Sequence, residues 1–212
     1  LAAIAQQDMK RMVAYSSVGH MGYILLAAAA ATPVALLGAV FQMVSHGLIS
    51  ALLFLLVGIV YRKTGTRDLS VLHGLLNPER GLPFTGTLMI LGVMASAGMP
   101  GMAGFISEFM VFRGSITAFP LATLLSMVGS GLTAVYFLLL VNRAFFGRLA
   151  VTPATDAVAD GRLDVRLAAV APRETIPAMG LAFAVVAIGL LPSGLGKLSE
   201  VASTSMAQLP AL

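Results

Sequence analysis

The chain has 212 residues, of which 58% are hydrophobic and only 10% are charged, whereas a soluble domain usually carries about 25% charged residues. The formal net charge is +4, but the basic residues flank apolar blocks and form no dense run, which argues against nucleic-acid binding. Cysteine is absent, which excludes disulfides, thiolate metal sites and thiol catalysis. Because long apolar blocks are typical of membrane spans, we expect an all-α polytopic transmembrane helical bundle.

The first two hydrophobic segments are predicted to be transmembrane helices. The first covers about 12–30 and follows a polar step in which Asp8 is placed to cap the helix. The second covers about 34–61, between a Thr-Pro turn and a basic pair. Residues 1–5 resemble the end of a further hydrophobic helix, and no signal-peptide pattern is visible, so we expect a fragment of a longer protein.

The third segment, about 82–112, is too long for one regular crossing. Its 31 residues would make a helix of about 46 Å, against a hydrocarbon core of about 30 Å. Pro100 and three glycines lie at 98–104 and favour a break into two half-helices. Irregular backbone at membrane depth survives only where it is buried in protein or lines a hydrated cavity, so the break indicates an ion or substrate site. A proline kink without function is the alternative.

Two more segments, about 116–141 and 176–191, bring the number of crossings to about five, one of them discontinuous. The polar stretch 148–175 between them is predicted to be a cytoplasmic loop. We therefore expect one transmembrane unit over 1–147, followed by that loop and by a last helix with its tail over 176–212.

The basic residues predict the orientation of the helices. Threading the five crossings places eleven basic residues on one side and two on the other, and this bias marks the first side as cytoplasmic. The first side holds Lys10, Arg11, Arg62, Lys63, Arg67, Arg80, Arg143, Arg148, Arg162, Arg166 and Arg173, and the second holds Arg113 and Lys197.

Glu108 is the acidic residue that falls inside an apolar segment, just beyond the break. A carboxylate at membrane depth costs several kcal/mol unless it is paired, hydrated or protonated. The pKa of such a group depends on burial and on neighbouring charges, and a proton relay needs that sensitivity. The alternative is a structural ion pair with Arg113, about one helical turn further on.

Two histidines lie on polar stripes of the first two helices. His46 shares one face of its helix with Gln42, Ser45 and Ser50, and His20 lies on a stripe with serines and a tyrosine. Histidine exchanges protons near neutral pH. Each could equally be a hydrogen-bonded core residue, but together with Glu108 they favour a proton relay.

Other polar residues carry weaker signals. Ser126, Ser130 and Thr133 share a face of the fourth helix and are expected to hold helices together. His73 is expected to be a solvated or packing residue in a cytoplasmic loop. No zinc spacing, phosphate-binding loop, dinucleotide-binding glycine pattern or nucleophile triad is visible, so we expect no cofactor, no metal and no redox site in this chain.

Three segments are similar to the antiporter-like membrane subunits of respiratory complex I, which are related to Mrp-type cation/proton antiporters. The segments are QDMKRMVAYSSVGHMG at 7–22, FQMVSHGL at 41–48 and GMPGMAGFISEF at 98–109. A Glu at position 108 resembles the branch called M in bacteria and D, or chain 4, in cyanobacteria and chloroplasts, whose sister subunits usually carry Lys there. The segment 135–148 resembles cyanobacterial chain 4 forms.

The resemblance implies most of the second of two inverted five-helix repeats plus the last helix, with the first repeat absent. It places His20 and His46 on the central hydrophilic axis and Glu108 at its terminal carboxylate, and we expect protons to move along this Glu108–His46–His20 axis. It implies other membrane-arm subunits as partners. NAD(P)H or ferredoxin, iron–sulfur clusters and quinone would be bound by those partners, in a bacterial inner membrane or a cyanobacterial thylakoid membrane.

Two alternatives to a proton-translocating NAD(P)H–quinone oxidoreductase subunit stay open at this point. The first is a subunit of an Mrp-type cation/proton antiporter, without a redox partner. The second is a passive membrane scaffold in which Glu108 and the histidines form only structural pairs.

Overall fold

The computed structural model describes residues 2–149, 167–197 and 205. The helices are α1 (Met9–Ala30), α2 (Pro33–Thr64), α3 (Pro83–Ser96), α4 (Ala103–Ser115), α5 (Pro120–Phe145) and α6 (Pro172–Leu190). No strand is present in this part of the chain, and Asp8 pairs with Asp68 in an isolated β-bridge. The fold is therefore all-α, as predicted.

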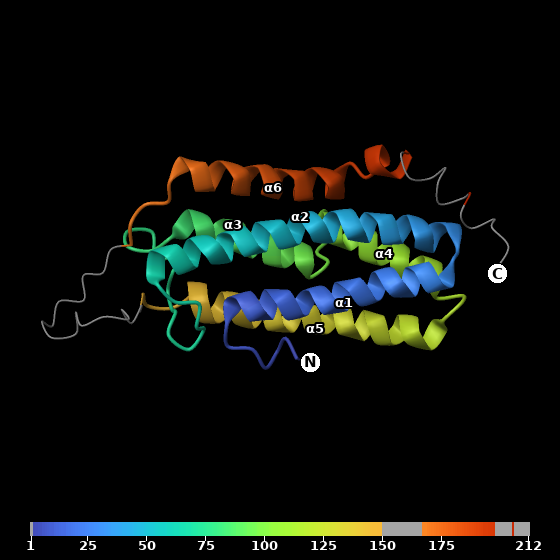
Figure 1. Ribbon diagram of the computed structural model, residues 1–212, viewed down its shortest axis with the longest axis horizontal. Coiled ribbons are helices and arrows are strands. Elements are labelled where there is room, and N and C mark those ends of the chain that lie inside the picture. The colour runs from blue at the N-terminus through green and yellow to red at the C-terminus, as the bar shows by residue number, and fades with distance from the viewer. Residues whose placement is uncertain (1, 150–166, 198–204, 206–212) are drawn as a thin grey trace, which may run out of the picture.

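The helices lie side by side in a bundle with α2 at its centre (Figure 1), and α2 packs against α1, α3, α4 and α6. Four of them, α1, α2, α5 and α6, are long and apolar enough to span a membrane. The shorter α3 and α4 follow each other along the bundle (Figure 1) and together make the remaining crossing. The predicted polytopic bundle with one discontinuous helix is confirmed.

Local sequence explains where the helices begin. Asp8 caps α1 by accepting a hydrogen bond of 3.0 Å from the Arg11 backbone N–H. Thr32 caps α2 in the same way. Pro120 opens α5 and Pro172 opens α6, whereas the hydrophobic pattern predicted starts at 116 and 176. Proline is well suited to the first helical turn because the N–H that it lacks would have no partner there.

The break between α3 and α4 lies at 97–102. Gly98 and Gly101 have φ of 72° and 88°, a left-handed conformation that glycine adopts without steric cost. A Cβ at Gly104, in the first turn of α4, would overlap the backbone carbonyl of Ala95 near the end of α3. The two half-helices therefore meet at a backbone contact that only glycine allows.

One end of the bundle gathers the basic residues. α1, α3 and α6 begin there and α2 and α5 end there (Figure 1). Hydrogen bonds and ion pairs confirm the proximity, since Arg67 pairs with Asp8, Arg62 pairs with Glu174 and the Lys63 ammonium donates to the Ala169 carbonyl. α4, which carries Arg113, ends at the opposite end. The predicted asymmetry holds for the described residues, whereas Arg162 and Arg166 lie outside them.

The loop between α2 and α3 packs against the helix ends at the basic end of the bundle. Its residues Leu69, Leu72 and Leu75 are fully buried, and its backbone donates hydrogen bonds to residues 144–146 at the end of α5. The His73 ring lies 2.9 Å from the Arg143 carbonyl oxygen, consistent with the packing role expected for it. The loop is thus part of the hydrophobic core and holds the helix ends in place.

Candidate functional site

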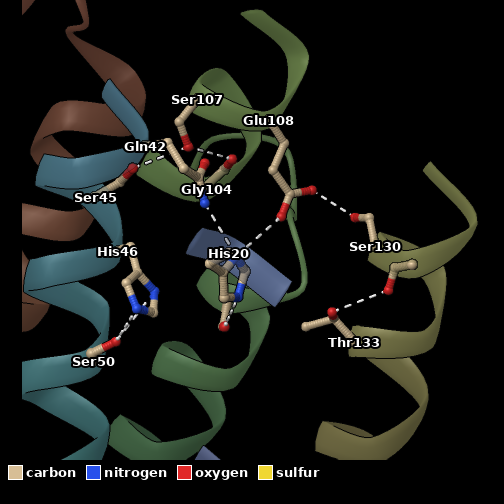
Figure 2. Close-up of polar contacts among 12 residues, drawn as sticks. His20, Gln42, Ser45, His46, Ser50, Gly104, Ser107, Glu108, Ser130 and Thr133 are labelled. Atoms are coloured by element: carbon tan, nitrogen blue, oxygen red, sulfur yellow. Dashed lines mark hydrogen bonds and ion pairs between the residues drawn. The ribbon is translucent and has the colours of Figure 1, made fainter. Parts of the chain in front are cut away.

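The three residues singled out from the sequence meet in the interior of the bundle (Figure 2). Glu108 comes from α4, His20 from α1 and His46 from α2. Their exposed fractions are 5%, 4% and 8%. The prediction that His46 and Glu108 share a polar interior, away from the lipid-facing surface, is consistent with this burial.

Helical periodicity directs the side chains inward. Ser16, His20 and Tyr23 form one buried face of α1, and Gln42 and His46 lie one turn apart on the buried face of α2. On α4 the start at Ala103 turns both Ser107 and Glu108 into the bundle. The site therefore depends on the break, because the break sets where α4 starts.

His20 is at the centre of the cluster (Figure 2). Its Nε2 lies 3.1 Å from the Ser96 hydroxyl, and its Nδ1 lies 3.1 Å from the amide nitrogen of Gln42. The same Nδ1 is 3.8 Å from Oε1 of Glu108. The ring centroids of His20 and His46 are 4.9 Å apart. His20 is therefore the neighbour of both other groups, and the predicted relay of Glu108, His46 and His20 stays a prediction.

The Glu108 carboxylate is held on one side only. Its Oε2 accepts a hydrogen bond of 2.6 Å from the Ser130 hydroxyl on α5, while its buried Oε1 has no hydrogen-bond partner among the described residues. A Cβ at Gly98 would lie 2.9 Å from Oε2, so this glycine leaves room for the carboxylate. Within the described residues no ion pair joins Glu108 to Arg113, so the structural pairing considered from the sequence does not occur.

His46 has its own partner on α2. The Ser50 hydroxyl, one turn further along, lies 3.2 Å from Nε2 of His46. Beside it, the Ser45 hydroxyl donates to the Ser107 hydroxyl at 3.0 Å, which joins α2 to α4. The polar stripe predicted for α2 therefore contacts two helices: Gln42 contacts His20 on α1, and Ser45 contacts Ser107 on α4.

The sequence analysis did not predict the role of two hydroxyl groups in the cluster. Ser96 lies at the end of α3 with no stripe to mark it, and its contact with His20 follows from packing alone. Ser130 was expected only to hold helices together, yet it contacts the carboxylate. The sequence feature that could have indicated this contact is the row of hydroxyl residues on one face of an otherwise apolar helix. Thr133 instead bonds within its own helix, to the Gly129 carbonyl.

The cluster combines one carboxyl group, two imidazoles, an amide and several hydroxyls. Carboxyl and imidazole groups exchange protons, whereas hydroxyl and amide groups orient them or carry hydrogen bonds between them. Within the described residues no group of three acidic or histidine side chains is placed to hold a metal ion. The arrangement is chemically suited to moving protons.

Comparison with known proteins agrees with this geometry. Residues 1–133 match the family described as "NADH:quinone oxidoreductase/Mrp antiporter, TM". The chain is 36% identical, over 98% of its length and 38% of the relative's, to NAD(P)H-quinone oxidoreductase chain 4 2 of Thermosynechococcus vestitus. It is 41% identical, over 69% of its length and 28% of the relative's, to NADH-quinone oxidoreductase subunit M of Escherichia coli.

The fold has a counterpart in a solved respiratory complex. A chain of respiratory complex I from Thermus thermophilus with bound NADH superposes with a TM-score of 0.84 at 24% identity, covering 98% of this chain and 41% of that one. The chain spans well under half the length of these relatives. Its match to the family over more than half its residues, together with its apolar helices, identifies a multi-pass integral membrane protein. The chain belongs to the NADH:quinone oxidoreductase/Mrp antiporter transmembrane family.

Proposed function

We propose that this chain is part of a proton-translocating membrane subunit of an NAD(P)H–quinone oxidoreductase. Glu108, His20 and His46 carry the protons, and other membrane-arm subunits are its partners. The redox chemistry belongs to those partners, which bind NAD(P)H or ferredoxin, iron–sulfur clusters and quinone, and this chain itself holds no redox site. The membrane is a bacterial inner membrane or a cyanobacterial thylakoid membrane.

The position of His20 carries the proposal. Its imidazole is within 3.8 Å of the Glu108 carboxylate and stacks near the His46 ring. Proton transfer between side chains requires direct hydrogen-bond reach or one bridging water. The distance of 3.8 Å between Glu108 and His20 is a short side-chain adjustment away from direct contact. The rings of His20 and His46 share no hydrogen bond among the described residues, so the proposed route between Glu108, His20 and His46 uses a bridging water for that second step.

The main alternative is an Mrp-type cation/proton antiporter subunit, because the matching family includes both kinds of protein. A relative that matches nearly the whole chain is a quinone oxidoreductase chain, and this favours the redox-coupled function. Co-purification of the full-length subunit with quinone-reducing subunits separates the two. A passive scaffold, the third alternative, predicts that removing the charge of Glu108 has no effect on proton movement.

The decisive experiment replaces Glu108 in the full-length subunit within the assembled complex. Glu108→Gln keeps the shape of the side chain and removes its titration, so quinone-coupled proton translocation in vesicles should fall about tenfold or more. Glu108→Asp should retain part of the activity. Assembly should be normal in both variants.

Glu79→Gln is the matched control, since Glu79 lies exposed in the loop before α3. It should leave proton translocation unchanged. Normal translocation by a fully assembled Glu108→Gln complex would rule out the relay and leave the carboxylate a structural role.

A further inference from the structure

One nitrogen of His20 faces two different partners. Nδ1 lies 3.1 Å from Nε2 of Gln42 and 3.8 Å from Oε1 of Glu108. The Gln42 amide is almost completely buried, and its oxygen has no hydrogen-bond partner among the described residues. A buried amide oxygen without a donor is costly. The Gln42 amide is therefore only half satisfied in this conformation, since its nitrogen has a partner and its oxygen has none among the described residues.

The Gln42 amide decides which nitrogen of His20 carries the proton. An amide nitrogen can only donate, so Nδ1 must accept from it and be unprotonated. The proton of the neutral ring is then on Nε2, facing Ser96. A hydroxyl both donates and accepts, so Ser96 suits either tautomer and selects neither. The other ring neighbours, Tyr23 and His46, contact His20 through ring faces and edges.

The arrangement changes when Nδ1 receives a proton. In the proposed relay the O–H bond of protonated Glu108 breaks and an N–H bond forms at Nδ1, which leaves a carboxylate and an imidazolium. Two N–H groups would then face each other across 3.1 Å. Rotation of the Gln42 amide by half a turn replaces its nitrogen with its unpartnered oxygen, which accepts from the new N–H.

The geometry points to Gln42 as a positioning residue whose amide keeps Nδ1 of His20 unprotonated and reverses when a proton arrives there. Nδ1 of His20 then has a hydrogen-bond partner in both protonation states, so neither state is strongly favoured over the other. This inference rests on the proposed relay through His20 but assigns a separate role to a residue that does not itself carry the proton.

Two substitutions test the two halves of this role. Gln42→Met keeps the length of the side chain and can neither donate nor accept strongly, whereas Gln42→Glu keeps the shape and, as a carboxylate, can only accept. Ser115→Ala is the matched control, because Ser115 is fully buried on the last turn of α4 and its hydroxyl has no hydrogen-bond partner within the described part of the chain. All variants are made in the full-length subunit and studied in the assembled complex.

The tautomer is measured by ¹⁵N solid-state NMR with labelled histidine in this subunit, and the His20 signals are assigned by difference from a His20→Gln variant. The native ring should show an unprotonated Nδ1. Gln42→Met should mix the two tautomers and Gln42→Glu should place a proton on Nδ1. Both should lower proton translocation about fivefold or more, the scale set by one lost buried hydrogen bond, while Ser115→Ala leaves both readouts unchanged.

Unchanged ¹⁵N signals in Gln42→Met would overturn the inference, whether or not translocation falls, because a packing role alone does not set the tautomer. Normal translocation with a mixed tautomer would also overturn it. The result is distinct from a failure of the relay, which would show as normal translocation by Glu108→Gln while the ¹⁵N signals still respond to Gln42.

Discussion

The basic end of the bundle and its polar interior use charge in opposite ways. At the basic end two carboxylates are paired with cations: Arg62 Nη2 lies 2.7 Å from Glu174 and Arg67 Nε lies 3.4 Å from Asp8. In the interior, Glu108 has a serine and a histidine as neighbours and keeps one oxygen without a hydrogen bond. The ion pairs of the basic end hold helix ends together, whereas in the interior the Glu108 carboxyl group can change its charge by gaining or losing a proton.

The difference follows from solvent. Ion pairs at an exposed end contribute about 1 kcal/mol or less, since water screens them and competes for them. A carboxylate in the interior costs several kcal/mol unless it is paired or hydrated, and a permanent cation beside it would fix its charge. Because no lysine or arginine among the described residues pairs with Glu108, its charge depends on the proton that it carries.

The largest effect should come from a substitution that prevents the close approach of the two half-helices, on which the interior site depends. Gly104→Ala would drive a Cβ into the Ala95 carbonyl, and backbone cannot yield as a side-chain end does. We expect a loss of about 3 kcal/mol or more and a failure of the subunit to assemble. The measurement is the amount of subunit retained in the purified complex. Gly131→Ala, where a Cβ meets no atom within 4 Å, should assemble normally.

An intermediate effect should come from the partner of the carboxylate. Ser130→Ala removes the 2.6 Å hydrogen bond to Glu108 and leaves both carboxylate oxygens free to reorient. Hydrogen bonds to charged groups contribute about 1.5–3 kcal/mol, so proton translocation should fall about fivefold or more with assembly intact. Ser126→Ala, one turn away on the same helix, is the control, and an equal fall in that variant would show a general effect on α5.

The smallest effect should come from the basic end. Glu174→Gln removes the charge of a carboxylate that is only 8% exposed but keeps an oxygen that can accept from Arg62, whose side chain is 56% exposed, so the cost in stability should be about 1 kcal/mol. Thermal unfolding of the assembled complex measures it, and the difference from the unmodified protein should shrink as salt is added. Proton translocation should be unchanged. A loss comparable to that of Ser130→Ala would mean that the two regions do not differ as described.

The sequence by itself determined the spans, the break and the inward faces of the first two helices. These features are local, because the length of an apolar run, a proline between glycines and polar residues spaced at one helical turn act within a single segment. The capping role of Asp8 and the common end of the basic residues followed for the same reason. The predicted starts of α5 and α6 differ from the observed starts at Pro120 and Pro172, because a hydropathy pattern does not identify a proline that opens a helix.

Only the tertiary structure decided which groups meet. Glu108 contacts Ser130 and lies near His20, and neither partner follows from spacing in the chain. His20 neighbours both Glu108 and His46, and among the described residues no ion pair joins Arg113 to the carboxylate. These outcomes depend on how closely α1 and α5 approach the broken helix. That approach is governed by side-chain packing and by glycine contacts between segments far apart in the chain, which no local pattern encodes.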